Sequence, residues 1–183
     1  MKPTISTFKL FGHRDIIRDT KRLAPAAVKL VGREVPGRMP RVEIVVTNAR
    51  GMAELATDAE IALAGYVDQR TRDKHLRQTN RQARDAAGRA IATPGGGVLL
   101  LVNAETHRTT EHVALTLVHE LTHAMQYSRR GVRERHVRHL RGAFGIEPAG
   151  WWANREHSRK TRDEEDEAYA AERLAAQLIR TAA

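Results

Sequence analysis

The sequence predicts an α+β fold that combines a small mixed sheet with several helices. Two observations indicate strands: residues 41–47 alternate between apolar and polar positions, and residues 98–102 form a short, wholly apolar run. A third observation indicates helices, because apolar residues recur at three- and four-residue intervals in 109–128 and again in 163–181. A chain of 183 residues with these elements is expected to form a single domain over residues 1–183.

The first part of the chain, residues 1–40, is predicted to be mainly helical. Residues 1–12 mix apolar and polar side chains and fit either a short strand or an ordered arm. From His13 the apolar spacing becomes helical, and Pro25 is expected to start a second helix or to kink the first. The segment 35–40, with two prolines and a glycine, should end the helical part.

Residues 41–128 are predicted to form the sheet and an active-site helix. The strand at 41–47 places Val42, Ile44 and Val46 on one face. Residues 52–65 are alanine-rich and fit either a helix or a short strand. Residues 68–89 are strongly charged, which is typical of a solvated helix or an inserted loop. The apolar run 98–102 follows a glycine-rich break and indicates a strand that is buried or half covered.

The helix predicted at about 109–128 contains the run His119-Glu120-Leu121-Thr122-His123. On a helix these two histidines lie one turn apart, about 6 Å along the axis, so both imidazoles can reach one metal ion. Glu120 projects from the same side and can hold a metal-activated water as a general base. The apolar residues fill the opposite side of the helix. A structural histidine would more often lie within that apolar side, so this arrangement favours a metal site.

Residues 129–183 are predicted to be helical again. A basic segment at 132–145 fits a short helix, residues 147–152 fit a turn, and a final amphipathic helix is expected from Asp163 to Thr181. Its first residues are the acidic cluster 163–167. A catalytic zinc usually has three protein ligands, and with no cysteine in the chain this cluster is the best source of the third. Acidic residues at a helix start can also simply stabilise its macrodipole.

At this point the chain resembles a known family. The run 119–126, His-Glu-Leu-Thr-His-Ala-Met-Gln, followed by Glu165-Asp166-Glu167-Ala168-Tyr169, is similar to the glutamate-zincin (gluzincin) branch of zinc metallopeptidases, in particular to compact, minimal members. The resemblance implies that Glu165 is the third ligand. It also implies a zincin-like fold in which residues 98–102 form an edge strand that pairs with an extended substrate.

Two departures from the family pattern concern the third ligand. Tyr169 stands where an aspartate or asparagine often follows the alanine, so a usual partner for a zinc-bound histidine is missing. Periodicity places Glu164 and Glu167 nearer to the centre of the apolar side of the last helix than Glu165. Glu164 is therefore an alternative ligand, and Glu167 stays open as well.

These features predict a zinc-dependent metallopeptidase that hydrolyses peptide bonds in a peptide or protein substrate. His119, His123 and Glu165 would bind one Zn²⁺ per chain, and Glu120 would act as the general base through a metal-activated water. The alternative is a zincin-like module that is catalytically silent and serves metal binding or nucleic-acid-associated regulation.

Composition narrows the remaining possibilities. The absence of cysteine excludes disulfides and cysteine nucleophiles. The formal net charge of +9 favours acidic or polyanionic partners, but aromatic residues make up only 4% of the chain, which disfavours base-stacking platforms. No stretch is apolar enough to cross a membrane and no signal sequence is recognised, so a cytoplasmic protein without membrane contact is expected. The oligomeric state is not indicated.

Overall fold

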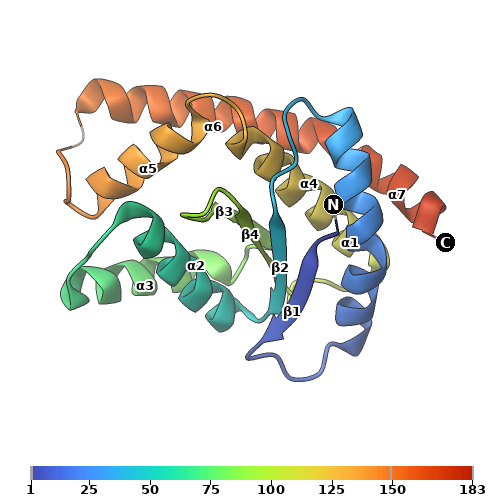
Figure 1. The fold of residues 1–183 in the computed structure, drawn as a ribbon. Coiled ribbons are helices and arrows are strands. Elements are labelled where there is room, and N and C mark those ends of the chain that lie inside the picture. The colour runs from blue at the N-terminus through green and yellow to red at the C-terminus, as the bar shows by residue number, and fades with distance from the viewer. Residues whose placement is uncertain (1, 149, 183) are drawn as a thin grey trace.

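The centre of the fold is a four-stranded mixed sheet, seen in a computed structural model that describes residues 2–148 and 150–182 (Figure 1). Its strands, in spatial order, are β1 (Thr4–Phe8), β2 (Val42–Thr47), β4 (Val98–Asn103) and β3 (Gly88–Ala92). β1, β2 and β4 run parallel, whereas β3 pairs with β4 in the antiparallel direction. The α+β class is thereby confirmed.

β4 is an interior strand, and this corrects the expectation that residues 98–102 form an edge. The run lies between β2 and β3, and both of its faces are covered, because Leu100 packs into one core cluster and Leu101 into the other. The edges of the sheet are β1 and β3. β3 was not expected as a strand, since it begins inside the charged segment 68–89 and only Ile91 and Ala92 are buried.

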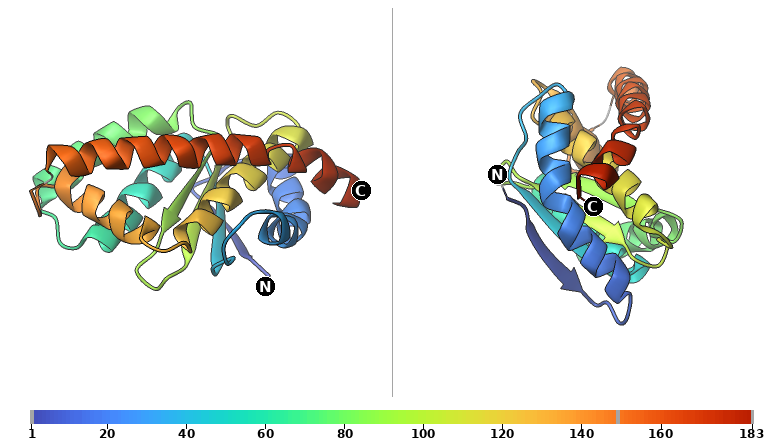
Figure 2. Two further views of the ribbon diagram at one scale, coloured as in Figure 1. Left: turned by 90° about the horizontal axis from the view of Figure 1, so that it is seen from above. Right: turned by 90° about the vertical axis from the view of Figure 1, so that its right-hand side faces the viewer.

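Two layers of helices cover the sheet (Figures 1 and 2). On one face, α1 (Arg14–Glu34), α4 (Thr110–Tyr127) and α7 (Leu174–Ala182) share a core cluster with Ile44 and Leu100. On the other face, α2 (Ala49–Ala64) and α3 (Gln69–Ala83) share a smaller core cluster with Val45 and Leu101. Successive strand residues point to opposite faces, so the apolar runs of β2 and β4 supply both clusters.

Several open predictions are decided by these elements. Residues 1–12 contain a strand, residues 52–65 belong to a helix, and the charged segment after residue 68 is mostly the helix α3. A second helix does not start at Pro25, because α1 runs through it to Glu34. The basic segment forms α5 (Val132–Ala143), and α4 matches the helix expected at 109–128.

The C-terminal part differs most from expectation. It holds two helices, α6 (Trp151–Ala171) and α7, instead of one helix from residue 163 (Figure 2). Only Ala168 and Ala171 are buried in α6, so its first half carries no apolar period that could reveal it. The acidic cluster 163–167 therefore lies in the middle of a helix, and its interpretation as a helix start stabilised by the macrodipole is wrong.

No helix in the described part of the chain is both long and apolar enough to span a membrane.

Candidate metal centre

α4 positions the His-Glu-x-x-His residues between the core and a cavity. Its start is capped by Thr109, whose side chain accepts a hydrogen bond from the backbone N–H of His112. Leu117, Leu121 and Met125 are fully buried against the sheet layer. The side chains of His119 and His123 stay 14% and 17% exposed on the opposite side, as the helical spacing predicts.

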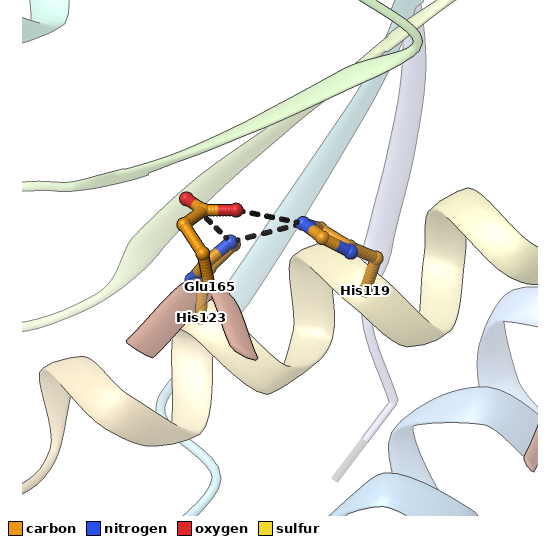
Figure 3. A group of neighbouring side chains, drawn as sticks. All are labelled: His119, His123 and Glu165. Carbon is orange, nitrogen blue, oxygen red and sulfur yellow. Dashed lines mark hydrogen bonds and ion pairs between the residues drawn. The ribbon is translucent and has the colours of Figure 1, made fainter. Parts of the chain in front are cut away.

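His119, His123 and Glu165 converge on one point (Figure 3). The two Nε2 atoms are 3.2 Å apart. Oε2 of Glu165 lies 3.5 Å from His119 Nε2, and its other oxygen, Oε1, lies 3.4 Å from His123 Nε2. A tetrahedral zinc ion with bonds of about 2.0–2.1 Å separates its ligand atoms by about 3.3–3.4 Å. One ligand atom from each of the three side chains lies within 4.8 Å of the others, so the group is close enough to hold one metal ion.

The neighbouring glutamates have other partners. Glu164 forms an ion pair with Arg135 of α5. Glu167 accepts two hydrogen bonds of 2.7 Å from the Arg129 guanidinium and one of 3.0 Å from the side-chain amide of Gln126. These contacts draw both side chains away from the two histidines. Of the three glutamates weighed from the sequence, only Glu165 belongs to the group that can hold a metal ion within the described residues.

Each histidine is oriented through its second ring nitrogen. Nδ1 of His119 lies 3.0 Å from a carboxylate oxygen of Glu172, and Nδ1 of His123 lies 2.8 Å from the side-chain oxygen of Gln126. Such partners fix the tautomer and leave Nε2 free to bind a metal. Neither partner was predicted. The available signal was spacing, because Glu172 follows Glu165 by two helical turns and Gln126 follows His123 by three residues.

Glu120 is buried beside the metal-binding group, and its residue is only 7% exposed. Burial raises the pKa of its carboxyl; the nearby charges of His123 and His119 oppose this, and Glu165 adds to it. Gly88 makes the room: a Cβ on this residue would come within 2.7 Å of Glu120 Cγ and of Thr116 Cγ2. A carboxyl with a raised pKa holds a proton more readily, which suits a group that must accept one.

His123 titrates differently from a free histidine. Burial opposes its charge, but the hydrogen bond to Glu165 and the nearby carboxylate of Glu120 outweigh burial and raise the pKa of His123 to about 9. Conversely, the hydrogen bond with His123 lowers the pKa of Glu165.

Two cavities flank these residues. The larger, of about 540 Å³, extends from His119, Glu120 and His123 toward α3, α5 and the first half of α6. The smaller, of about 440 Å³, begins at His119 and Glu120 and runs past Leu115 to Tyr169. Gly88 at the start of β3 lines both. The candidate metal centre thus lies where two cavities meet below the free edge of β3.

Three further side chains that could donate a hydrogen bond to an oxyanion line these cavities. Tyr127 and His157 line the larger one, and the Tyr127 hydroxyl donates to the carbonyl of Ala90 at 3.4 Å. Tyr169 lines the smaller one, and its ring centroid is 4.9 Å from that of His119. His136 and His139 also line the larger cavity, but within the described residues they are not part of the group that could hold a metal ion.

Comparisons with known proteins supply no relative. No protein-family model matches the sequence, and searches of curated proteins and of solved structures found no match. Function must therefore be inferred from the chemistry of these side chains.

Proposed function

We propose that this protein is a zinc-dependent metallopeptidase of the glutamate-zincin type. His119, His123 and Glu165 bind one Zn²⁺, and Glu120 is the general base. The observation that carries the proposal is the convergence of His119, His123 and Glu165, from each of which one ligand atom lies within 4.8 Å of the others, with Glu120 buried next to them. Two imidazoles and one carboxylate suit a catalytic zinc, which needs a position free for water.

In this proposal, each residue of the site has a separate role in hydrolysis. A zinc ion held here supplies Lewis acidity, which lowers the pKa of water toward 7 and polarises a carbonyl group. Glu120 accepts a proton from the attacking water and delivers it to the leaving amine. Glu172 and Gln126 hold the two imidazoles in the tautomer that the metal requires.

The free edge of β3 is the proposed substrate-binding strand. β3 pairs with β4 on one side only, and Gly88, Arg89 and Ala90 line the larger cavity. An extended peptide can add to such an edge through main-chain hydrogen bonds. This assignment replaces residues 98–102, which have no free edge.

Metal content and peptidase activity together test the proposal. We expect about one zinc per chain in the wild type and in Glu120→Ala, and its selective loss in Glu165→Ala. Glu164→Ala is the matched control, because it removes a neighbouring carboxylate that is paired with Arg135. Peptide hydrolysis should require both zinc and Glu120. A folded wild type that binds no zinc after resupply would refute the metal centre.

A catalytically silent module is the first alternative. It would keep zinc but hydrolyse no peptide, and Glu120 would then be dispensable. Against it, the chain maintains a buried carboxyl next to the proposed metal and reserves a glycine, Gly88, to make room for it. A binding site alone does not need that base.

Association with nucleic acid is the second alternative, and one observation favours it. Residues 129–162 carry ten Lys/Arg and three Asp/Glu, so most of the net charge of +9 lies in α5 and the first half of α6. Phosphate contacts would make binding fall steeply as salt rises. Absence of DNA and RNA binding at low salt would remove this alternative without affecting the peptidase proposal.

A further inference from the structure

The far wall of the larger cavity carries chemistry that the proposed hydrolysis does not use. We call it the histidine wall: His136 and His139 of α5 and His157 of α6. The rings of His139 and His157 stack at 3.8 Å with an angle of 13°, and those of His136 and His157 are 6.4 Å apart. Stacked rings direct their nitrogen lone pairs side by side rather than at one point, so the wall does not form a second metal site.

The acidic groups beside the histidine wall are already neutralised. One oxygen of Glu60 accepts from Arg89 at 2.5 Å, and the other lies 2.6 Å from His75 Nε2. Burial opposes the charge of Glu60, but these two partners outweigh burial and lower its pKa. Glu164 is paired with Arg135. The histidine wall, at a distance from Glu120 and Glu165 of the candidate metal centre, therefore offers little free negative charge to a cationic ligand.

In contrast, this wall contains polar atoms that lack a hydrogen-bond partner, and at least one of them is a donor. Arg135 is bonded to Glu164 through one terminal nitrogen, while its Nε is buried without a hydrogen-bond partner. Nδ1 of His139 and Nδ1 of His157 are also buried without one. A guanidinium nitrogen can only donate, so the missing partner of Arg135 must be an acceptor. A buried donor left without an acceptor destabilises the protein by about 1–3 kcal/mol.

The electrostatic environment points the same way. Burial lowers the pKa of His157 to about 4, and the neighbouring His139, His136 and Arg135 contribute in the same direction. Burial also lowers the pKa of His136 to about 4, aided by His139, Arg89 and Arg135 but opposed by Glu60. Burial disfavours charge of either sign, whereas the contribution of the Arg135 guanidinium to both shifts indicates a positive potential at the wall, which favours an anion over a cation.

We infer that the histidine wall, together with Arg135, forms a subsite for a carboxylate of the substrate. The inference rests on the proposed peptidase function, since the same cavity contains His119, Glu120 and His123. A peptide bound at the metal can present a carboxylate there in two ways. It comes either from an aspartate or glutamate side chain next to the scissile bond or from the free C-terminus of the peptide.

Metal-anchored probes test the subsite without knowledge of the substrate sequence. A succinyl hydroxamate, which chelates zinc, is coupled through an amide to one of four groups: Ala-amide, Asn-amide, Asp-amide or alanine with a free carboxylate. Dissociation constants are measured on the zinc-loaded wild type. We expect at least one carboxylate probe to bind about tenfold tighter than its neutral counterpart, because hydrogen bonds to charged groups are the stronger ones. Tighter binding of the Asp-amide probe would indicate that the subsite accepts an acidic side chain within the peptide. Tighter binding of the probe with a free alanine carboxylate would indicate that it accepts the C-terminus of the peptide.

Matched variants locate the effect. Arg135→Gln should remove the advantage of the carboxylate probe and leave the neutral probes unchanged. Arg138→Gln, on the exposed side of the same helix, should leave the tighter binding of the carboxylate probe unchanged. If Arg135→Gln does not fold, His157→Asn serves as a second variant of the histidine wall, because it retains a polar side chain at this position. In each variant, zinc content and affinity for the neutral probes, both unchanged from the wild type, are the control that the metal centre is intact.

The outcomes separate the two proposals. Equal binding of neutral and carboxylate probes, or an advantage that survives both Arg135→Gln and His157→Asn, would overturn the subsite while leaving the peptidase standing. If no hydroxamate binds to folded, zinc-supplied protein, the metal centre fails, and the subsite that depends on it fails with it.

Discussion

His119 is held between a carboxylate within α6 and a second one in the residue that caps the C-terminal end of this helix. Its Nε2 faces Glu165 and its Nδ1 faces Glu172, and these glutamates lie seven residues apart, about 10.5 Å along α6. Both ring nitrogens of His119 are therefore held by carboxylates, which fixes the orientation of the imidazole ring. If His119 binds zinc as proposed, Glu172 would take the role that the resemblance to glutamate-zincins gives to an acidic or amide side chain at position 169, where Tyr169 stands.

Replacing Glu172 should weaken zinc binding without removing a ligand. We expect Glu172→Ala to lower zinc affinity by about 10- to 100-fold, because His119 loses the partner that fixes its tautomer. Glu172→Gln, whose amide oxygen can still accept from Nδ1, should lie between Ala and the wild type. Affinity is measured by competition with a chelator. Asp166→Ala, exposed on α6, is the control, and an equal effect of both substitutions would contradict a specific role for Glu172.

Residues of the site that share one helix could be predicted, and those that depend on packing could not. The spacing of His119, Glu120 and His123 follows from helical geometry alone, and their common side of α4 is confirmed. Glu165 was chosen by resemblance over Glu164 and Glu167, and the structure brings it to the histidines. Gly88 and the histidine wall could not be foreseen, because they depend on which element lies opposite which.

At the scale of elements, β3 and α4 are fitted to each other. The first residue of β3 is Gly88, and a side chain there would collide with Glu120 and Thr116. Thr116 is itself fixed, since its hydroxyl lies 2.9 Å from Nε2 of the buried His107. The strand that we propose to bind substrate therefore also sets the position of the general base.

Gly88→Ala should reduce activity while zinc is retained. The added methyl group must displace the Glu120 side chain, and a misplacement of about 1 Å can reduce catalysis about 100-fold. The metal ligands are untouched, so zinc content should stay as in the wild type. Gly95→Ala is the matched control in the β3–β4 turn, because a Cβ there has no neighbour within 4 Å. Full peptidase activity in Gly88→Ala would contradict the tight fit.

The elements themselves were predictable where apolar periodicity was strong. α4, β2 and β4 follow from their sequence patterns. The position of β4 within the sheet could not be predicted in this way, because strand order is a tertiary property that a local sequence pattern does not determine. β3 and the first half of α6 were missed for the opposite reason, since both are partly exposed and carry few apolar residues.

At the scale of the molecule, two half-buried histidines should make stability depend on pH. His136 and His157 have pKa values lowered to about 4 from the ordinary value of about 6.5, so the unfolded chain binds more protons between these limits. Their contribution is complete above pH 6.5 and is lost as pH falls toward 4. The free energy of unfolding should therefore decrease from pH 7 to pH 5.

Denaturant unfolding of the zinc-free protein at both pH values measures this decrease. The double variant His136→Gln/His157→Gln should show a smaller decrease than the wild type. His123, whose pKa is raised to about 9, acts in the opposite direction above pH 6.5, but it is present in both proteins and cancels in the difference. An unchanged pH dependence in the variant would show that the two histidines do not titrate as inferred.

Because the acidic cluster 163–167 lies in the middle of α6, insertions and deletions within this helix should be poorly tolerated. Along α6, Glu164 contacts Arg135, Glu165 contacts His119 and His123, Glu167 contacts Arg129, and Glu172 at its end contacts His119. Each added residue turns the rest of a helix by about 100°. An insertion after Glu165 would thus rotate Glu172 away from His119, whereas one before Trp151 would leave the phase intact. Descendants of this sequence should gain or lose residues before α6 far more readily than within it.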